Sequence, residues 1–116
     1  MRRGEIWLVE LDPVRGSEAN KTRPCVIVSS DSSNIAVTRT HRGMVTVVPL
    51  TSSSRPPRNF QARVRADKSN GLSSDSTAQA EQIRAVDYSR FVRHIGILDW
   101  EQRAALDAAI LTHLDL

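Results

Sequence analysis

The 116-residue sequence has one cysteine, few aromatic residues and no long apolar run. The single cysteine, Cys25, excludes an internal disulfide and a multi-cysteine metal site, and its apolar neighbours predict a buried core position. No stretch approaches the roughly 18 consecutive apolar residues of a membrane-spanning helix. The N-terminal residues lack the apolar segment of a secretory signal. The three histidines lie far apart. We therefore expect a cytoplasmic protein that needs no metal and no cofactor.

The length and the apolar fraction of 40% fit one domain, residues 1–116, with one modest core. Aromatic residues make up only 4% of the chain. Trp7 and Trp100 are expected in the core or in an interface. A broad aromatic platform for stacking nucleic-acid bases is therefore not expected, and base recognition would depend on hydrogen bonds and on arginine stacking.

Acidic residues are absent from one long segment, Ser32 to Ala66, which instead contains six arginines: Arg39, Arg42, Arg55, Arg58, Arg63 and Arg65. Residues 1–65 hold 11 basic and 5 acidic side chains, whereas residues 66–116 hold 5 and 8, which together give the net charge of +3. A guanidinium group can hold a phosphate with two hydrogen bonds. A net charge of +3 alone would fit an ordinary solubilising surface, but the clustering favours a nucleic-acid partner.

The alternation of apolar and polar residues predicts about five strands, mostly antiparallel and strongly curved. We expect them at Arg3–Asp12, Cys25–Ser30, Met44–Leu50, Phe60–Ala66 and Ser76–Val86. Alternation in the fourth strand would place Arg63 and Arg65 on its outward face.

The remaining segments predict connections and two helices. Asp31–Gly43 is polar and is interpreted as a connection closed by a hairpin turn at Arg42-Gly43. Residues 52–59 predict a mobile basic loop, and a second loop is expected around Asn70-Gly71. Asp87 is a candidate N-cap for a short helix ending at Val92. A longer C-terminal helix is expected from the capping box Asp99–Gln102 and from the spacing of three apolar residues, Leu106, Ile110 and Leu114.

Two residues stand out as candidates for phosphate chemistry. Arg23 precedes the second predicted strand, and Thr51 follows the third. If the two strands are neighbours, both ends open on one face of the sheet. RNA cleavage through its own 2′-hydroxyl requires mainly alignment and charge stabilisation, which an arginine and a hydroxyl can provide. From the residues alone, Arg23 is as well explained by binding as by catalysis.

The short motifs of the chain form a recognisable set. They are Arg3-Gly4-Glu5-Ile6-Trp7, Asp12-Pro13, Gly16-Ser17-Glu18, Arg23-Pro24, Val28-Ser29, Val48-Pro49-Leu50-Thr51-Ser52 and Glu81-Gln82-Ile83-Arg84. In this order and spacing the sequence resembles the MazF/PemK family of toxin endoribonucleases. The resemblance implies a mainly β (α+β) fold, an SH3-like curved antiparallel β-barrel with a C-terminal helix and short additional helices. It also implies a homodimer and metal-independent, sequence-specific cleavage of single-stranded RNA.

The resemblance further implies partners and roles for individual residues. A MazE-like antitoxin would block the RNA groove, and operator DNA could be bound together with that antitoxin. Arg23 and Thr51 fall on the catalytic positions, which leave a 2′,3′-cyclic phosphate and a 5′-hydroxyl. The expected RNA contacts are Ser17, Ser52 and Gln82, joined by Arg55 and Arg58 of the basic loop.

Several alternatives stay open at this point. Ser17 would also serve to cap a turn, Gln82 as a structural hydrogen-bonding residue, and Arg84 as a partner of Glu18 or Glu81. The Ser53–Arg58 segment departs from many family members, so no cleavage sequence can be transferred. Two other functions fit the fold: a toxin that poisons DNA gyrase, although residues 113–116 lack the aromatic end expected of one, and a non-catalytic nucleic-acid-binding regulator.

Overall fold

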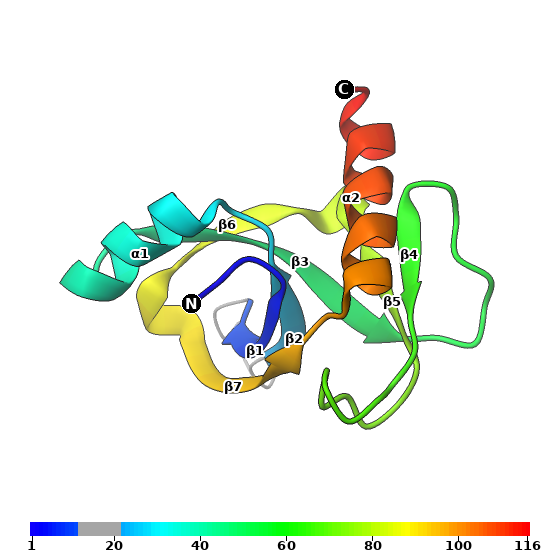
Figure 1. Ribbon diagram of the computed structural model, residues 1–116, viewed down its shortest axis with the longest axis horizontal. Coiled ribbons are helices and arrows are strands. Elements are labelled where there is room, and N and C mark those ends of the chain that lie inside the picture. Colours follow the sequence, from blue (N-terminus) through cyan, green and yellow to red (C-terminus); the bar gives the residue numbers. More distant parts are fainter. Residues whose placement is uncertain (12–21) are drawn as a thin grey trace, which may run out of the picture.

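The computed structural model describes residues 1–11 and 22–116. In this part of the chain, seven strands form one bent antiparallel sheet in the order β4-β5-β3-β2-β1-β7, with β6 also beside β3 (Figure 1). The strands are β1 (Glu5–Glu10), β2 (Thr22–Ile27), β3 (Met44–Ser52), β4 (Gln61–Val64), β5 (Ser76–Gln79), β6 (Arg84–Asp87) and β7 (Phe91–Ile97). The helices are α1 (Asp31–Thr40), α2 (Trp100–Leu114) and the short 3-10 helices η1 (Ala80–Gln82) and η2 (Tyr88–Arg90). The predicted mainly β architecture with a C-terminal helix is confirmed.

The nine-residue strand β3 joins the two halves of the sheet. Its middle pairs with β2 from Val47 to Pro49, and its end pairs with β5 from Leu50 to Ser52. The second and third predicted strands are therefore neighbours, as expected. Because side chains alternate along a strand, β3 sends apolar residues to both of its faces.

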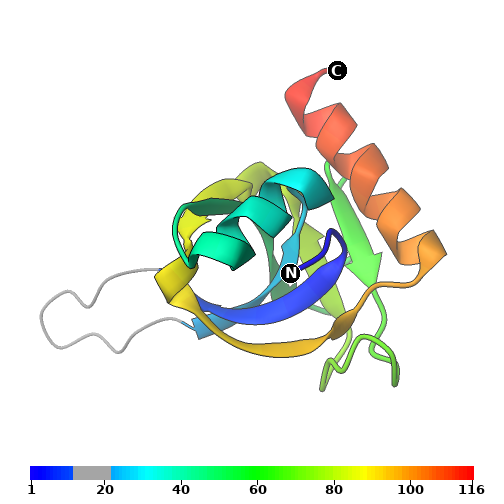
Figure 2. The same cartoon turned by 60° about the vertical axis from the view of Figure 1, so that its left-hand side comes forward.

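Two apolar clusters result, one on each face of the bent sheet. One cluster contains Val48 and Leu50 of β3 and is covered by Leu106 and Ala109 of α2. The other contains Val45 and Val47 of β3, Cys25 of β2 and Val37 of α1. Figure 2 shows the two helices at different sides of the sheet, with α2 running along β4. The single core expected from the length is thus divided by the sheet, and the buried position predicted for Cys25 is confirmed.

Helix α1 was not predicted, and the hairpin interpretation of Asp31–Gly43 is wrong. Ser30 caps the helix by accepting a hydrogen bond from the Ser33 amide at 3.3 Å. The buried Asn34 side chain donates to the Ser29 carbonyl at 3.0 Å and accepts from the Ser29 hydroxyl at 2.6 Å. Serine, asparagine and threonine are unfavourable in helix interiors because their side chains compete for the hydrogen bonds of nearby backbone groups. Here the tertiary contacts of Asn34 and Val37 stabilise a helix that local propensity does not indicate.

The segment after β4 was only partly predicted. The strand expected at Ser76–Val86 is interrupted by η1, and the helix expected after Asp87 is only the three-residue η2. Asp87 caps that turn as predicted, accepting from the Ser89 amide at 2.9 Å and the Ser89 hydroxyl at 2.6 Å. These two bonds lower the pKa of the Asp87 carboxyl. Strand β7 follows and pairs with β1, a partner more than 80 residues earlier in the chain.

The C-terminal helix begins as expected. Asp99 Oδ1 accepts from the Gln102 amide at 2.8 Å, and Gln102 Oε1 accepts from the Asp99 amide at 3.1 Å, which confirms the capping box. Of the predicted stripe, Leu106 is buried and Ile110 packs against the core, but Leu114 is 46% exposed. Trp100 is 81% exposed, which excludes the core and leaves an interface as its predicted position. Among the described residues, no helix combines the length and the apolar character that crossing a membrane requires.

The predicted turn around Asn70 and Gly71 closes the curved sheet by packing on β7. Asn70, fully buried, donates to the Arg65 carbonyl at 2.7 Å and accepts from the Asp67 amide at 3.0 Å. The Ile97 amide donates to the Ser69 carbonyl at 3.0 Å. Gly96 allows this approach, because a Cβ atom there would lie 2.4 Å from the Asn70 carbonyl carbon. The loop following β4 therefore touches β7, the strand at the other end of the sheet order.

Candidate active site

Arg23 and Thr51 lie on adjacent strands and share one face of the sheet. The β2–β3 ladder runs from Ile27↔Val47 to Cys25↔Pro49, two residues before Arg23 and Thr51. Because side chains alternate along a strand, the Arg23 side chain projects from the same face of β2 as that of Cys25. In the same way, the Thr51 side chain projects from the same face of β3 as that of Pro49. Residues paired across an antiparallel ladder point to the same side. Both side chains are half-buried.

A second arginine lies near the same face. Arg84 of β6 pairs with Val47 of β3, which in turn pairs with Ile27 of β2. Burial raises the pKa of the Cys25 thiol to about 12, and the positive charges of Arg84 and Arg23 act in the opposite direction. Both guanidinium groups thus act on the pKa of the Cys25 thiol. Two arginines and a threonine hydroxyl on one face can hold phosphate oxygens.

Thr51 also borders a pocket of about 240 Å³, here called the Thr51 pocket. Its lining residues are Thr51, Ser53, Arg55, Pro56, Arg58, Gln61, Thr77 and Gln79. Three of the residues proposed from the sequence, Thr51, Arg55 and Arg58, therefore come together around one cavity. Arg23 is not part of its wall.

The floor of the Thr51 pocket is a polar face of three strands. Thr51 of β3 pairs with Thr77 of β5, and Thr77 pairs on its other side with Arg63 of β4. One step further along the same face, Gln79 pairs with Gln61. The intervening residues on β3, β5 and β4 point into the apolar cluster beneath α2. The strand alternation therefore gives this end of the sheet one apolar and one polar face.

The loop between β3 and β4 forms the rim of the pocket and is fixed by hydrogen bonds. Arg63 Nη1 donates to the Ser53 carbonyl at 3.0 Å, and its Nη2 donates to the Arg55 carbonyl at 2.6 Å. The Arg58 amide donates to Gln61 Oε1 at 3.1 Å. Arg63 does lie on the polar face that the sequence predicted, where it positions the loop that carries Arg55.

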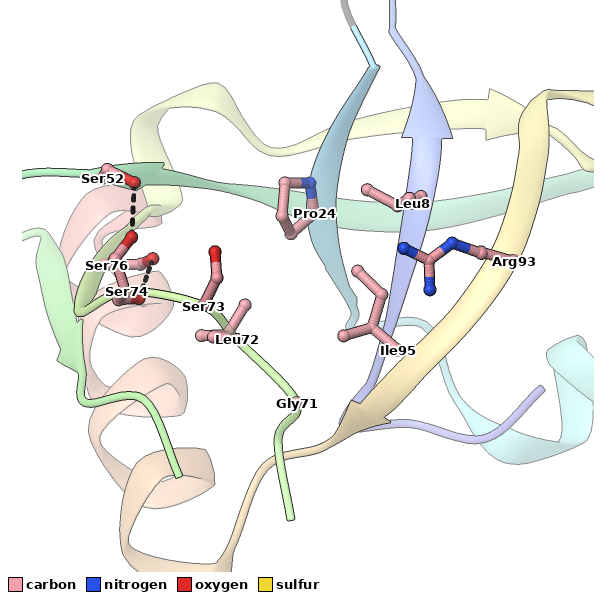
Figure 3. Close-up of a pocket in the computed structure, with 10 residues that line it drawn as sticks. All are labelled: Leu8, Pro24, Ser52, Gly71, Leu72, Ser73, Ser74, Ser76, Arg93 and Ile95. Atoms are coloured by element: carbon pink, nitrogen blue, oxygen red, sulfur yellow. Dashed lines mark hydrogen bonds between the residues drawn. The ribbon is translucent and has the colours of Figure 1, made fainter. Parts of the chain in front are cut away.

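Ser52 faces the opposite side of β3 and lines a second cavity of about 260 Å³, here called the Ser52 pocket (Figure 3). Its wall consists of Leu8, Pro24, Ser52, Gly71, Leu72, Ser73, Ser74, Ser76, Arg93 and Ile95. The hydroxyls of Ser52 and Ser74 are 2.9 Å apart, and Arg93 of β7 lies across the cavity from them. A ligand that contacts both Thr51 and Ser52 must therefore pass over the end of β3.

The other proposed residues stand apart from these pockets. Gln82 is exposed at the end of η1 and lines neither the Thr51 pocket nor the Ser52 pocket. Ser17 lies outside the described residues. Within the ranges 1–11 and 22–116, no three histidine, cysteine, aspartate or glutamate side chains gather in a way that could hold a metal ion.

Sequence reasoning missed Thr77 and Gln79. The signal was present, since both are polar residues alternating with Ala78 and Ala80, which is the pattern of a strand with one polar face. Only the pairing of β5 with β3 shows that this polar face continues from Thr51.

The fold and its arginine-rich face define a small mainly β protein suited to a polyanionic partner. The pattern of the PemK-like, MazF-like toxins of type II toxin–antitoxin systems matches residues 2–114. The chain belongs to this family. It is 51% identical over its full length to Endoribonuclease MazF9 of Mycobacterium tuberculosis, covering 98% of that protein.

Solved structures of similar fold include Mycobacterium tuberculosis toxin MazF-mt6, with a TM-score of 0.74 and 29% identity over 97% of both chains. An endoribonuclease in complex with its cognate antitoxin, from a mycobacterial species, has a TM-score of 0.76 and 20% identity over 100% of this chain and 96% of that one. The second likeness concerns the fold alone.

Proposed function

We propose that this toxin is an endoribonuclease that cleaves single-stranded RNA without a metal ion. The observation that carries the proposal is the placement of Arg23 and Thr51 on one face of adjacent strands. The full-length relative that is 51% identical bears the name endoribonuclease, which supports the same activity. Arg55 and Arg58, which come from the acid-free segment between Ser32 and Ala66, supply charge that an RNA ligand requires.

In the proposed reaction the RNA provides its own nucleophile. The 2′-oxygen bonds to the adjacent phosphorus and loses its proton, the bond from phosphorus to the 5′-oxygen breaks, and that oxygen takes up a proton. The products are a 2′,3′-cyclic phosphate and a 5′-hydroxyl. Negative charge builds on the phosphate oxygens, to which the Arg23 guanidinium and the Thr51 hydroxyl donate hydrogen bonds.

The remaining residues bind the RNA in this proposal. Arg55 and Arg58 border the Thr51 pocket and attract the backbone on one side of the scissile phosphate. Ser52 contacts the part of the strand that passes over the end of β3. Ser17 and Gln82 are retained as RNA contacts from the family resemblance.

We also propose the partners that the family implies: a second copy of the chain, a MazE-like antitoxin and, with that antitoxin, operator DNA in the cytoplasm. The similar fold solved with its cognate antitoxin supports an antitoxin partner. For the dimer, exposed apolar residues of the C-terminal region, Trp100, Leu111, Leu114 and Leu116, offer surface that a second copy could cover.

The test is incubation of the purified protein with a long single-stranded RNA in EDTA. We expect cut RNA with cyclic-phosphate ends. Arg23→Ala and Thr51→Val should each lower the cleavage rate about 10²- to 10³-fold, because each removes one donor to the transition state. Arg39→Ala, which changes an arginine on α1, is the matched control and should cut at the normal rate.

Two results would contradict the proposal. Folded Arg23→Ala or Thr51→Val protein with normal activity would remove the assigned residue roles. Intact RNA with the unmodified protein would leave the gyrase-poisoning toxin or the non-catalytic regulator, which inhibition of gyrase and binding of operator DNA would then distinguish.

A further inference from the structure

Thr77 has a buried hydroxyl that lacks a partner. The residue is only 4% exposed, and no hydrogen bond reaches its Oγ1 from anywhere in the described part of the chain. A buried hydroxyl without a partner lowers the stability of a folded protein, so such groups are rare and need an explanation. Thr77 lines the Thr51 pocket. A ligand in this pocket could supply the missing hydrogen bond.

The position of Thr77 fixes where that ligand would lie relative to the reaction. Thr77 pairs directly with Thr51 across the β3–β5 ladder, and residues paired in this way have Cβ atoms about 5 Å apart. Both side chains project from the same face. A group bound at Thr77 is therefore the immediate neighbour of the phosphate held by Thr51, within the span of a single nucleotide.

The chemistry of the wall fits a nucleobase better than a second phosphate. A phosphate only accepts hydrogen bonds, whereas the Thr77 hydroxyl and the Gln79 amide can both donate and accept. No hydrogen bond of the Gln79 side chain occurs within the described ranges. The Gln61 amide is already engaged, since it accepts from the Arg58 amide and donates to Glu81 Oε2 at 2.6 Å. Hydrogen-bond donors and acceptors that are both unengaged suit the edge of an unpaired base, which also carries both.

The rim of the pocket can hold such a base in place. Arg55 lies in the loop that Arg63 anchors through the Ser53 and Arg55 carbonyls. A guanidinium plane on a fixed loop can stack on a base and attract its phosphate. The loop supplies Ser53, Arg55, Pro56 and Arg58 to the wall of this pocket of about 240 Å³.

We propose that the Thr51 pocket binds the unpaired base adjacent to the scissile phosphate, and that Thr77 and Gln79 read the edge of this base. These two residues then determine one position of the cleavage sequence. This inference rests on the proposed endoribonuclease activity and names the part of the protein that gives that activity its selectivity.

The test compares cleavage-site profiles on a pool of random single-stranded RNA, with all cut ends sequenced. The variants are Thr77→Val, which keeps the shape and removes the hydroxyl, and Gln79→Met, which keeps the length and removes the amide. In both, the ratio of cutting between the preferred and the other bases at one position beside the cut should fall about 5- to 20-fold. Thr46→Val, the same replacement on β3 away from the pocket, is the control and should keep the original profile.

Thermal unfolding separates a recognition role from a structural one. Because Thr77→Val removes an unpartnered buried hydroxyl, its Tm should equal or exceed that of the unmodified protein. A clearly lower Tm would mean that the hydroxyl stabilises the fold and would overturn the inference.

The outcomes for the two proposals are distinct. Cleavage with the same base preferences in Thr77→Val, Gln79→Met and the unmodified protein would overturn the base-reading pocket and leave the endoribonuclease intact. Intact RNA with the unmodified protein would overturn both.

Discussion

At the scale of single residues, Cys25 shows how burial and charge oppose each other beside the candidate site. The thiol is fully buried, and burial raises its pKa to about 12 although Arg84 and Arg23 favour the thiolate. Desolvation therefore outweighs the attraction of two nearby cations. The thiol stays protonated at neutral pH, packs in the cluster beneath α1 and donates a hydrogen bond to the Arg23 carbonyl at 3.6 Å.

This raised pKa predicts a loss of stability in alkaline solution. The unfolded thiol loses its proton near pH 9, whereas the folded thiol keeps it until about pH 12. The stabilisation that comes from the neutral, buried thiol is complete below pH 9 and is lost between these two pH values. Over this range the free energy of unfolding falls with a slope that approaches about 1.4 kcal/mol per pH unit. Urea unfolding of the native protein and of Cys25→Ala at pH 8, 9 and 10 measures it. Equal slopes in the two proteins would contradict the assigned burial.

At the scale of elements, two side chains of β4, Arg63 and Gln61, join the β3–β4 loop to the sheet. The guanidinium group of Arg63 donates hydrogen bonds to two loop carbonyls. The loop in turn places Arg55 and Arg58 at the Thr51 pocket. The sequence suggested a mobile loop because it is rich in serine, proline and arginine. The observed hydrogen bonds define one arrangement of its rim, which favours selective binding.

Replacing Arg63 by lysine should therefore affect RNA cleavage more than folding. Lysine keeps the charge but cannot form the same planar fork, so at least one of the two carbonyl bonds is lost. We expect a loss of about 1 kcal/mol in the free energy of unfolding and a larger, severalfold drop in the cleavage rate of a single RNA. Arg65→Lys, which changes the exposed residue directly after β4, is the control. A normal cleavage rate in Arg63→Lys would show that the loop does not need this anchor.

At the scale of the whole molecule, the sheet has a polar and an apolar face at the β4–β5 end and places helices at two sides. Arg23, Arg84, Arg55 and Arg58 come from β2, β6 and the β3–β4 loop, which are separate in sequence. The fold thus gathers along β3 charge that is dispersed in the sequence, with Arg55 and Arg58 beside Thr51 and Arg84 opposite Val47. The acidic residues that predominate in the C-terminal half do not cancel this charge. Some of them, such as Glu101 and Asp107, lie on α2, which covers the apolar face of the sheet.

This gathering of charge predicts a strong effect of salt on RNA binding. If these four arginines contact phosphates, the logarithm of the binding constant should fall with the logarithm of salt concentration with a slope of about −3. Arg55→Ala should reduce the slope by about 0.7, and Arg39→Ala should leave it unchanged. Titrations with a 2′-O-methyl RNA, which cannot be cleaved through its own 2′-hydroxyl, measure this slope. A slope near zero would contradict the charged face as the binding site.

The sequence by itself determined what depends on neighbouring residues. It predicted the first four strands, the turn around Asn70 and Gly71 and the capping box of α2, because alternation and capping are local patterns. It also singled out Arg23 and Thr51, since their positions at the ends of apolar runs follow from the chain alone. Its family motifs led to the family that the full-length match shows.

Only the tertiary structure decided the features that rest on distant partners. Helix α1 is stabilised by the buried Asn34 and Val37, and β7 exists because it pairs with β1. The same applies to the site: Ser52 turns away from Thr51, and Thr77 comes to lie beside it, because β3 pairs with β5 in one particular register. A shift of one residue in this register would turn every side chain of the strand to the opposite face. The register is selected by the burial of apolar side chains across the whole sheet, and no short segment selects it alone.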